Sequence, residues 1–221
     1  MFFVSLLAFT LLLSACQSST PASRVEVYRF EGWDEDEPAG TYPANMRFFM
    51  SQEDRDPYLE DPAPCLYDGP YNATSRTRIR GYGAQGIGFI NTGSSDFCDG
   101  GKLGVVALAL NTLATEALEL SFTVGTVEAN SRAYAWRLQY RLGREGTFED
   151  VRDAEGLPVE YVRQEDGHEQ RFEALALPEE TANQGVLELR WRYYYTGLRE
   201  DPDSGARSKL RLADIVVTGL R

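Results

Sequence analysis

A strict alternation of apolar and polar side chains in the second half of the chain constrains its fold more than any other feature. Within residues 133–142, Tyr134, Trp136, Leu138 and Tyr140 occupy alternate positions, and arginine or glutamine stands between the later ones. Successive side chains of a β-strand point to opposite faces, so this pattern predicts an antiparallel strand with one face in the core. Residues 185–196 repeat it. No window shows the 3.6-residue period of a capped amphipathic helix.

Turn-forming residues divide the chain into segments of strand length. Glycine, asparagine and aspartate gather between these segments, for example at 143–146 and 203–205. The predicted strands are 24–31, 46–50, 86–92, 103–110, 118–124, 133–142, 158–163, 169–177, 185–196 and 209–218. So many short strands with aromatic inner faces predict an all-β fold, a jelly-roll-like antiparallel β-sandwich, with a closed barrel as the alternative.

The N-terminal residues have the features of a targeting segment. Residues 2–13 are an apolar run that is too short to cross a bilayer, since a spanning helix needs about 20 residues. Small residues then precede Cys16 in the sequence Leu13-Ser14-Ala15-Cys16, the pattern of a lipoprotein signal peptide, although no Lys or Arg precedes the apolar run. An ordinary secretory peptide with a chance cysteine is the alternative.

These features predict the organisation of the whole chain. We expect a signal peptide at 1–15, a lipidated, flexible tether at 16–23, and one β-sandwich domain at 24–221. Gln17 stands where many Gram-negative lipoproteins carry the aspartate that retains them in the inner membrane. We therefore expect a lipid anchor in the outer membrane, on either face of it.

The charge of the chain argues against one class of partner. Its formal net charge is −12, with 34 acidic and 22 basic side chains. Nucleic-acid binding needs a positive footprint, so we expect no nucleic-acid partner. The partners left open are the membrane, through the lipid anchor, and a polysaccharide or an envelope protein.

Three cysteines are present, and lipidation would use one of them. In an oxidising compartment the other two, Cys65 and Cys98, are expected to form a disulfide. Closing a loop of this length would stabilise the fold by about 4 kcal/mol if the bridge is unstrained. Their spacing does not suit a metal site.

Several segments, taken in order, resemble an accessory jelly-roll β-sandwich domain of large secreted bacterial proteins, where it stands beside lamin-tail, CotH-kinase-like or phosphoesterase modules. The segments are 77–81 (TRIRG), 86–93 (GIGFINTG), 108–112 (LALNT), 130–132 (NSR), 137–141 (RLQYR), 189–195 (LRWRYYY) and 211–215 (RLADI). The resemblance implies the fold but no activity, because that domain has none assigned. Here the domain would stand alone as a lipoprotein.

Asp214 is a candidate calcium ligand. Simple alternation places it on the face of Leu210, Leu212 and Val216, which points its carboxylate toward the core. A buried charge must be paired or bound to a metal. We expect either an ion pair with an inward arginine or a structural Ca²⁺ shared with Glu31.

Arginines and aromatic residues are the candidate ligand-binding side chains. Arg137, Arg141, Arg190 and Arg192 are expected on outward faces of two strands, either in cross-strand ion pairs or as a patch for anionic glycans or lipid head groups. Arg137 and Arg190 are its candidate ligand-binding residues. Aromatic residues in expected loops could stack on sugar rings or plug minor cores. They are Trp33, Tyr58, Tyr67, Tyr71 and Tyr82. Trp33 is the best placed because four acidic residues follow it.

Motifs of the common enzyme classes are missing from the sequence. We therefore expect a non-catalytic binding or adhesion module, with glycan as a candidate ligand. A structural subunit of an envelope assembly and a jelly-roll hydrolase are the alternatives, since fold alone does not decide among them.

Overall fold

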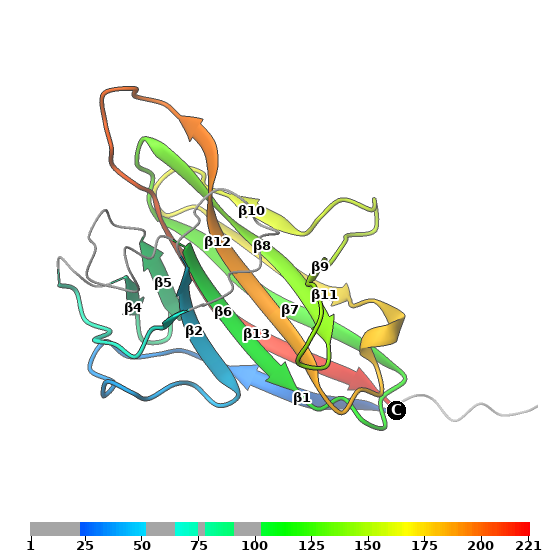
Figure 1. Cartoon of the computed structure of the whole chain (residues 1–221). Helices are drawn as coiled ribbons and strands as arrows, with labels where there is room; N and C mark the ends of the chain where they lie inside the picture. The colour runs from blue at the N-terminus through cyan, green and yellow to red at the C-terminus, as the bar shows by residue number, and fades with distance from the viewer. Residues whose placement is uncertain (1–22, 52–64, 75–77, 91–102) are drawn as a thin grey trace, which may run out of the picture.

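Two antiparallel sheets are stacked face to face in the computed structural model, which describes residues 23–51, 65–74, 78–90 and 103–221 (Figure 1). In the first sheet the strand order is β11-β7-β13-β5-β4, and β1 pairs with the C-terminal half of β13. Its strands are β1 (Arg24–Phe30), β4 (Ile79–Gly81), β5 (Ile87–Ile90), β7 (Ala117–Glu128), β11 (Glu169–Ala176) and β13 (Lys209–Leu220).

In the second sheet the order is β10-β8-β12-β6-β2-β3, and β9 also pairs with β8. Its strands are β2 (Met46–Ser51), β3 (Cys65–Leu66), β6 (Leu103–Leu110), β8 (Arg132–Leu142), β9 (Glu149–Asp150), β10 (Glu160–Val162) and β12 (Leu187–Arg199). A single 3-10 turn, η1 (Glu179–Thr181), follows β11. No helix within the described ranges is long and apolar enough to cross a membrane.

This architecture confirms the predicted antiparallel β-sandwich. All of the ten predicted strands are present, and most of their ends lie within two or three residues of the predicted ones. The sequence did not indicate β3, β4 or β9, each of which is only two or three residues long.

The core lies between the sheets, and β8 and β12 supply its largest side chains. Trp136 is opposite Tyr193 in the register, and Leu138 is opposite Trp191, so the apolar faces of the two strands coincide. Phe89 reaches across from β5 of the other sheet, with its ring centroid 4.8 Å from that of Trp136. All five side chains are at most 2% exposed.

A β-bulge in β13 overturns the inward orientation predicted for Asp214. The pairing of β13 with β7 shifts register between Ala213 and Val216, and Asp214 has a φ of 51°. The extra residue reverses the alternation, so Ile215 and Val217 take the buried positions and Asp214 is only half-buried. The prediction was wrong because it assumed an unbroken strand.

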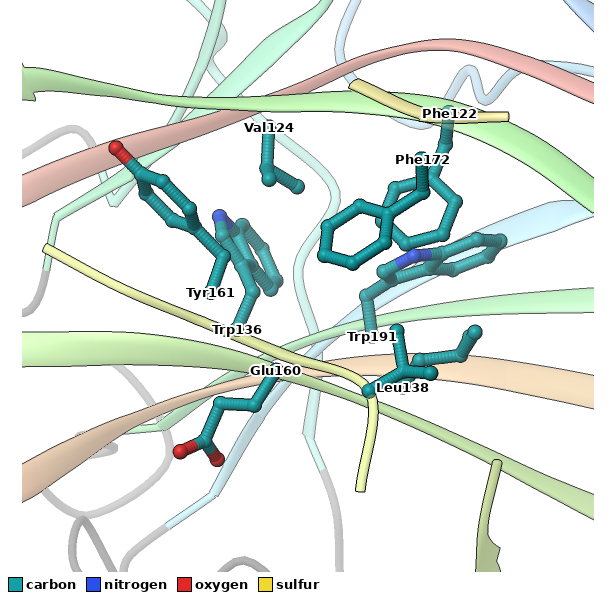
Figure 2. Close-up of a pocket in the computed structure, with 9 residues that line it drawn as sticks. Phe122, Val124, Trp136, Leu138, Glu160, Tyr161, Phe172 and Trp191 are labelled. Carbon is teal, nitrogen blue, oxygen red and sulfur yellow. The ribbon is translucent and has the colours of Figure 1, made fainter. Parts of the chain in front are cut away.

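A gap remains in the core near the outer strands β10 and β11 (Figure 2). It has no space for the centre of a water molecule. Its lining residues are Phe122, Val124, Trp136, Leu138, Val159, Glu160, Tyr161, Phe172 and Trp191. The Glu160 carboxylate points away from it (Figure 2). A void that is apolar and too small for water belongs to the core, so it is no binding site.

Candidate functional site

A surface pocket lies where the segment that follows β1 passes the end of β4. We call it the Tyr82 pocket, and its lining residues are Asp34, Glu35, Asp36, Arg80, Gly81, Tyr82 and Gly83. Its volume is about 420 Å³. Small-molecule pockets usually measure about 300–1,000 Å³, so this pocket has room for a sugar ring.

Backbone hydrogen bonds hold the two sides of the pocket together. The Trp33 amide donates to the Gly83 carbonyl at 3.0 Å, and the Gly83 amide donates to the Trp33 carbonyl at 2.9 Å. The Trp33 side chain is half-buried, and its ring meets that of Tyr71 edge-on at a centroid distance of 5.6 Å. The tryptophan therefore anchors the acidic segment to the core.

The Tyr82 ring forms a flat surface in the pocket. It packs so closely on the backbone of β5 that a Cβ atom on Gly88 would lie 2.2 Å from the ring, so only glycine fits beneath it. The Arg80 guanidinium lies 4.9 Å from the centroid of the ring. Tyr82 is half-exposed, so the pocket combines an aromatic surface with a charged donor.

Charged side chains supply hydrogen-bonding groups around this ring. Arg80 Nη2 lies 3.4 Å from Glu35 Oε2, and the two side chains are 37% and 49% exposed. Asp34 and Asp36 are exposed in the same segment. Carboxylates accept and guanidinium groups donate charge-assisted hydrogen bonds, so the pocket can bind a polyhydroxyl compound.

The structure changes which aromatic residue is available to a ligand. Trp33, the best placed in the sequence, packs against the core and does not line the pocket, whereas Tyr82 does. Tyr67 and Tyr71 are fully buried, and Tyr58 lies outside the described residues. Sequence reasoning missed Arg80; the two glycines that flank Tyr82 are the available signal of a close backbone approach.

Arg137 lies between two acidic side chains on the outer face of the second sheet. Its Nη1 is 3.1 Å from Asp150 Oδ2, and its Nε is 2.6 Å from Glu160 Oε2. Burial by itself would lower the pKa of Arg137, but the hydrogen bond and charge of Glu160 raise it overall. Arg141 pairs with Glu188 at 2.5 Å. Arg137 and Arg141 are therefore in ion pairs, which is one of the two arrangements expected from the sequence.

Arg190 is not the exposed cation expected from its place in the alternation. It is 4% exposed, and Arg192 is 2% exposed. The Phe148 ring covers Arg190 at 3.8 Å from its guanidinium carbon, and Arg190 Nε donates to Gln139 Oε1 at 2.7 Å. The expected exposure is wrong because the connection between β8 and β9 brings Phe148 over the sheet, a contact that alternation does not encode. Ligand binding by Arg137 and Arg190 stays a prediction.

Glu31 and Asp214 do not form a recognisable cation site by themselves. The Glu31 side chain is 81% exposed, and its Oε1 atom lies 4.0 Å from Arg29 Nε. Within the described ranges, no group of three or more His, Cys, Asp or Glu side chains could hold a metal ion. The calcium site stays a prediction. So do the lipid on Cys16 and the disulfide between Cys65 and Cys98, since Cys16 and Cys98 lie outside the described residues.

Comparison with known proteins does not assign the chain to a family. The chain matches no protein-family model and no curated protein. One similar solved structure is the K3 adhesin domain of Lys-gingipain from Porphyromonas gingivalis, which is 13% identical with a TM-score of 0.47, over 88% of this chain and 100% of that one. Another is a xylan-binding module, CBM15, which is 14% identical with a TM-score of 0.38, over 90% and 97% of the two chains. At these identities and TM-scores, neither similarity assigns a function to this chain.

Proposed function

We propose that this protein is a non-catalytic glycan-binding module and that the Tyr82 pocket is its binding site. The observation that carries the proposal is the half-exposed Tyr82 ring beside Arg80 and three acidic side chains in an open pocket. A sugar ring has an apolar C–H face and a rim of hydroxyl groups. An aromatic ring matches the face, and charged donors and acceptors match the rim.

The rigidity of the pocket supports this role. The paired backbone hydrogen bonds between Trp33 and Gly83 hold its two walls, and the β5 backbone supports the Tyr82 ring. A ligand would therefore bind without ordering the walls, which reduces the entropy lost on binding.

Affinity electrophoresis against a panel of soluble neutral polysaccharides tests the proposal. We expect at least one polymer to retard the wild-type protein. We also expect the protein to release no reducing sugar from that polymer. Tyr82→Ala should weaken binding about tenfold, because an aromatic contact contributes about 0.5–1.5 kcal/mol beyond its buried area, whereas Tyr82→Phe should retain it.

A matched pair of arginine variants is the control. Arg80→Gln should weaken retardation, and Arg171→Gln should not, since Arg171 forms a comparable exposed ion pair, with Glu173 at 2.8 Å, outside the pocket. The proposal is wrong if no polymer retards the wild type, or if Tyr82→Ala is retarded equally.

We also propose that a lipid on Cys16 anchors the module in the outer membrane. The signal-peptide pattern and the polar residues 17–23 support this location. Labelled palmitate should enter the wild-type protein and not Cys16→Ser, and an unlabelled wild type would contradict the proposal.

A further inference from the structure

The connection between β12 and β13 lies at one end of the sandwich (Figure 1), and three arginines are neighbours in the backbone pairing there. Arg132 at the start of β8 is the register partner of Arg199 at the end of β12. On its other side, Arg132 forms an isolated parallel bridge with Arg207. Register partners place their Cβ atoms about 5 Å apart on one face. We call these three residues the arginine row.

The arginine row has no carboxylate partner among the residues that the structure describes. Arg199 Nε donates to the carbonyl oxygens of Asp201 and Ser204 at 3.1 and 2.8 Å. Arg132 lies over the Tyr195 ring, 5.8 Å from its centroid. The Nε atoms of Arg132 and Arg207 are buried and donate no hydrogen bond to any described atom. Donors of this kind are costly to leave unpaired.

Three acidic side chains in the neighbouring segments have contacts of their own. Glu200 pairs with Arg163 at 2.5 Å, and Glu128 pairs with Lys209 at 2.5 Å. Asp201 accepts the Asp203 amide at 2.9 Å. Like charges directly opposite one another destabilise a sheet, so an anion bound to the arginine row would relieve that repulsion.

The backbone beneath the arginine row is held firmly. Ser208 Oγ donates to the carbonyls of Asn130 and Arg132 at 3.0 and 2.8 Å. Asn130 Nδ2 donates to the Arg207 carbonyl at 2.9 Å. These bonds hold the backbone of Arg132 beside that of Arg207 in the absence of a ligand, and a preformed site loses less entropy on binding.

We propose that the arginine row binds an oxyanion, a carboxylate or a sulfate group. Guanidinium groups match both through parallel N–H donors. The proposal does not depend on the Tyr82 pocket. It assigns anion binding to arginines other than Arg137, Arg141 and Arg190, whose guanidinium groups already contact acidic side chains or Phe148.

Two probes at constant ionic strength test the site in the full chain: sodium sulfate against sodium chloride in thermal unfolding, and trigalacturonate in calorimetric titration. We expect the wild type to bind at least one of the two probes. Which probe binds shows whether the site prefers a sulfate or a carboxylate group. The double variant Arg132→Gln/Arg207→Gln should bind at least tenfold more weakly. Its melting temperature in chloride should be no lower than that of the wild type, because the repulsion is relieved.

Arg24→Gln/Arg171→Gln is the matched control. It removes two exposed arginines that have carboxylate partners, Glu119 and Glu173. This variant should bind both probes with the affinity of the wild type. Any stabilisation by sulfate that does not involve the arginine row, such as its exclusion from the protein surface, should act equally on the control and on Arg132→Gln/Arg207→Gln. The proposal is overturned if the wild type binds neither probe, or if Arg132→Gln/Arg207→Gln binds both as tightly as the control does.

Discussion

At the scale of single residues, the outer face of the second sheet carries charges that are paired and largely removed from solvent. Asp150 is 2% exposed in its side chain and contacts both Arg137 and Gln139, at 3.1 and 3.0 Å. Tyr194 donates to Glu160 at 2.5 Å, and burial, together with this bond, raises the pKa of Tyr194. A charged cluster of this kind depends on every member, because each loss leaves a buried group without its partner.

Asp150→Ala should therefore destabilise the protein by about 3 kcal/mol, the magnitude for a buried ion pair that loses one partner. Chemical denaturation of wild type and variant measures this loss. Glu173→Ala, which breaks an exposed pair, should change the free energy of unfolding by less than about 1 kcal/mol. Equal losses in the two variants would show that the burial of Asp150 has no energetic consequence.

At the scale of elements, β13 is the strand on which the first sheet depends. It pairs with β7 along one edge and with β5 and β1 in succession along the other. The bulge at Asp214 separates these two sections, since β5 pairs with Lys209–Leu212 and β1 pairs from Ile215 onward. One extra residue thus turns the strand between its two partners.

The left-handed conformation of Asp214 makes this element testable. Asp214→Val should destabilise the protein by about 1–2 kcal/mol, because a β-branched side chain is strained at a φ of 51°. Asp214→Gly should be neutral or stabilising in the same denaturation experiment. If the glycine variant were the less stable of the two, the carboxylate would have a role of its own, such as the predicted binding of calcium.

At the scale of the whole molecule, one close contact in the core joins the two sheets. Phe89 from the first sheet lies against Gly104 in β6 of the second, where an added Cβ would come within 1.9 Å of the ring. Phe89 also meets Trp136 and Tyr193 at centroid distances of 4.8 and 6.0 Å. The Phe89 ring therefore occupies the space that a side chain at position 104 would need.

Gly104→Ala should destabilise the protein by about 1–3 kcal/mol, the usual range for an overpacked core. Combining it with Phe89→Leu, which removes part of the ring, should recover some of that loss, so that the two effects are not additive. Thermal unfolding of the two single variants and the double variant measures the coupling. Strict additivity would mean that the two residues do not meet.

The sequence by itself determined the fold class and most of the strands. Apolar residues such as Leu118, Trp136 and Trp191 recur at every second position, which is the spacing that buries one face of a sheet. The same local rule failed at Asp214, where a bulge of one residue reverses every later side chain. The alternation also could not show that the connection between β8 and β9 crosses the outer face of the second sheet and covers Arg190 with Phe148.

The sequence offered Tyr82 as one of five aromatic candidates, but only the tertiary structure shows which residues surround it and which arginines lie together. The Tyr82 pocket joins residues 34–36 to residues 80–83, and the arginine row joins three segments that include 132, 199 and 207. Such neighbours arise from strand register and loop packing between distant segments, and no local period reports them. Alternation tells which face of a strand a side chain occupies, whereas the partners across that face follow only from how the strands assemble.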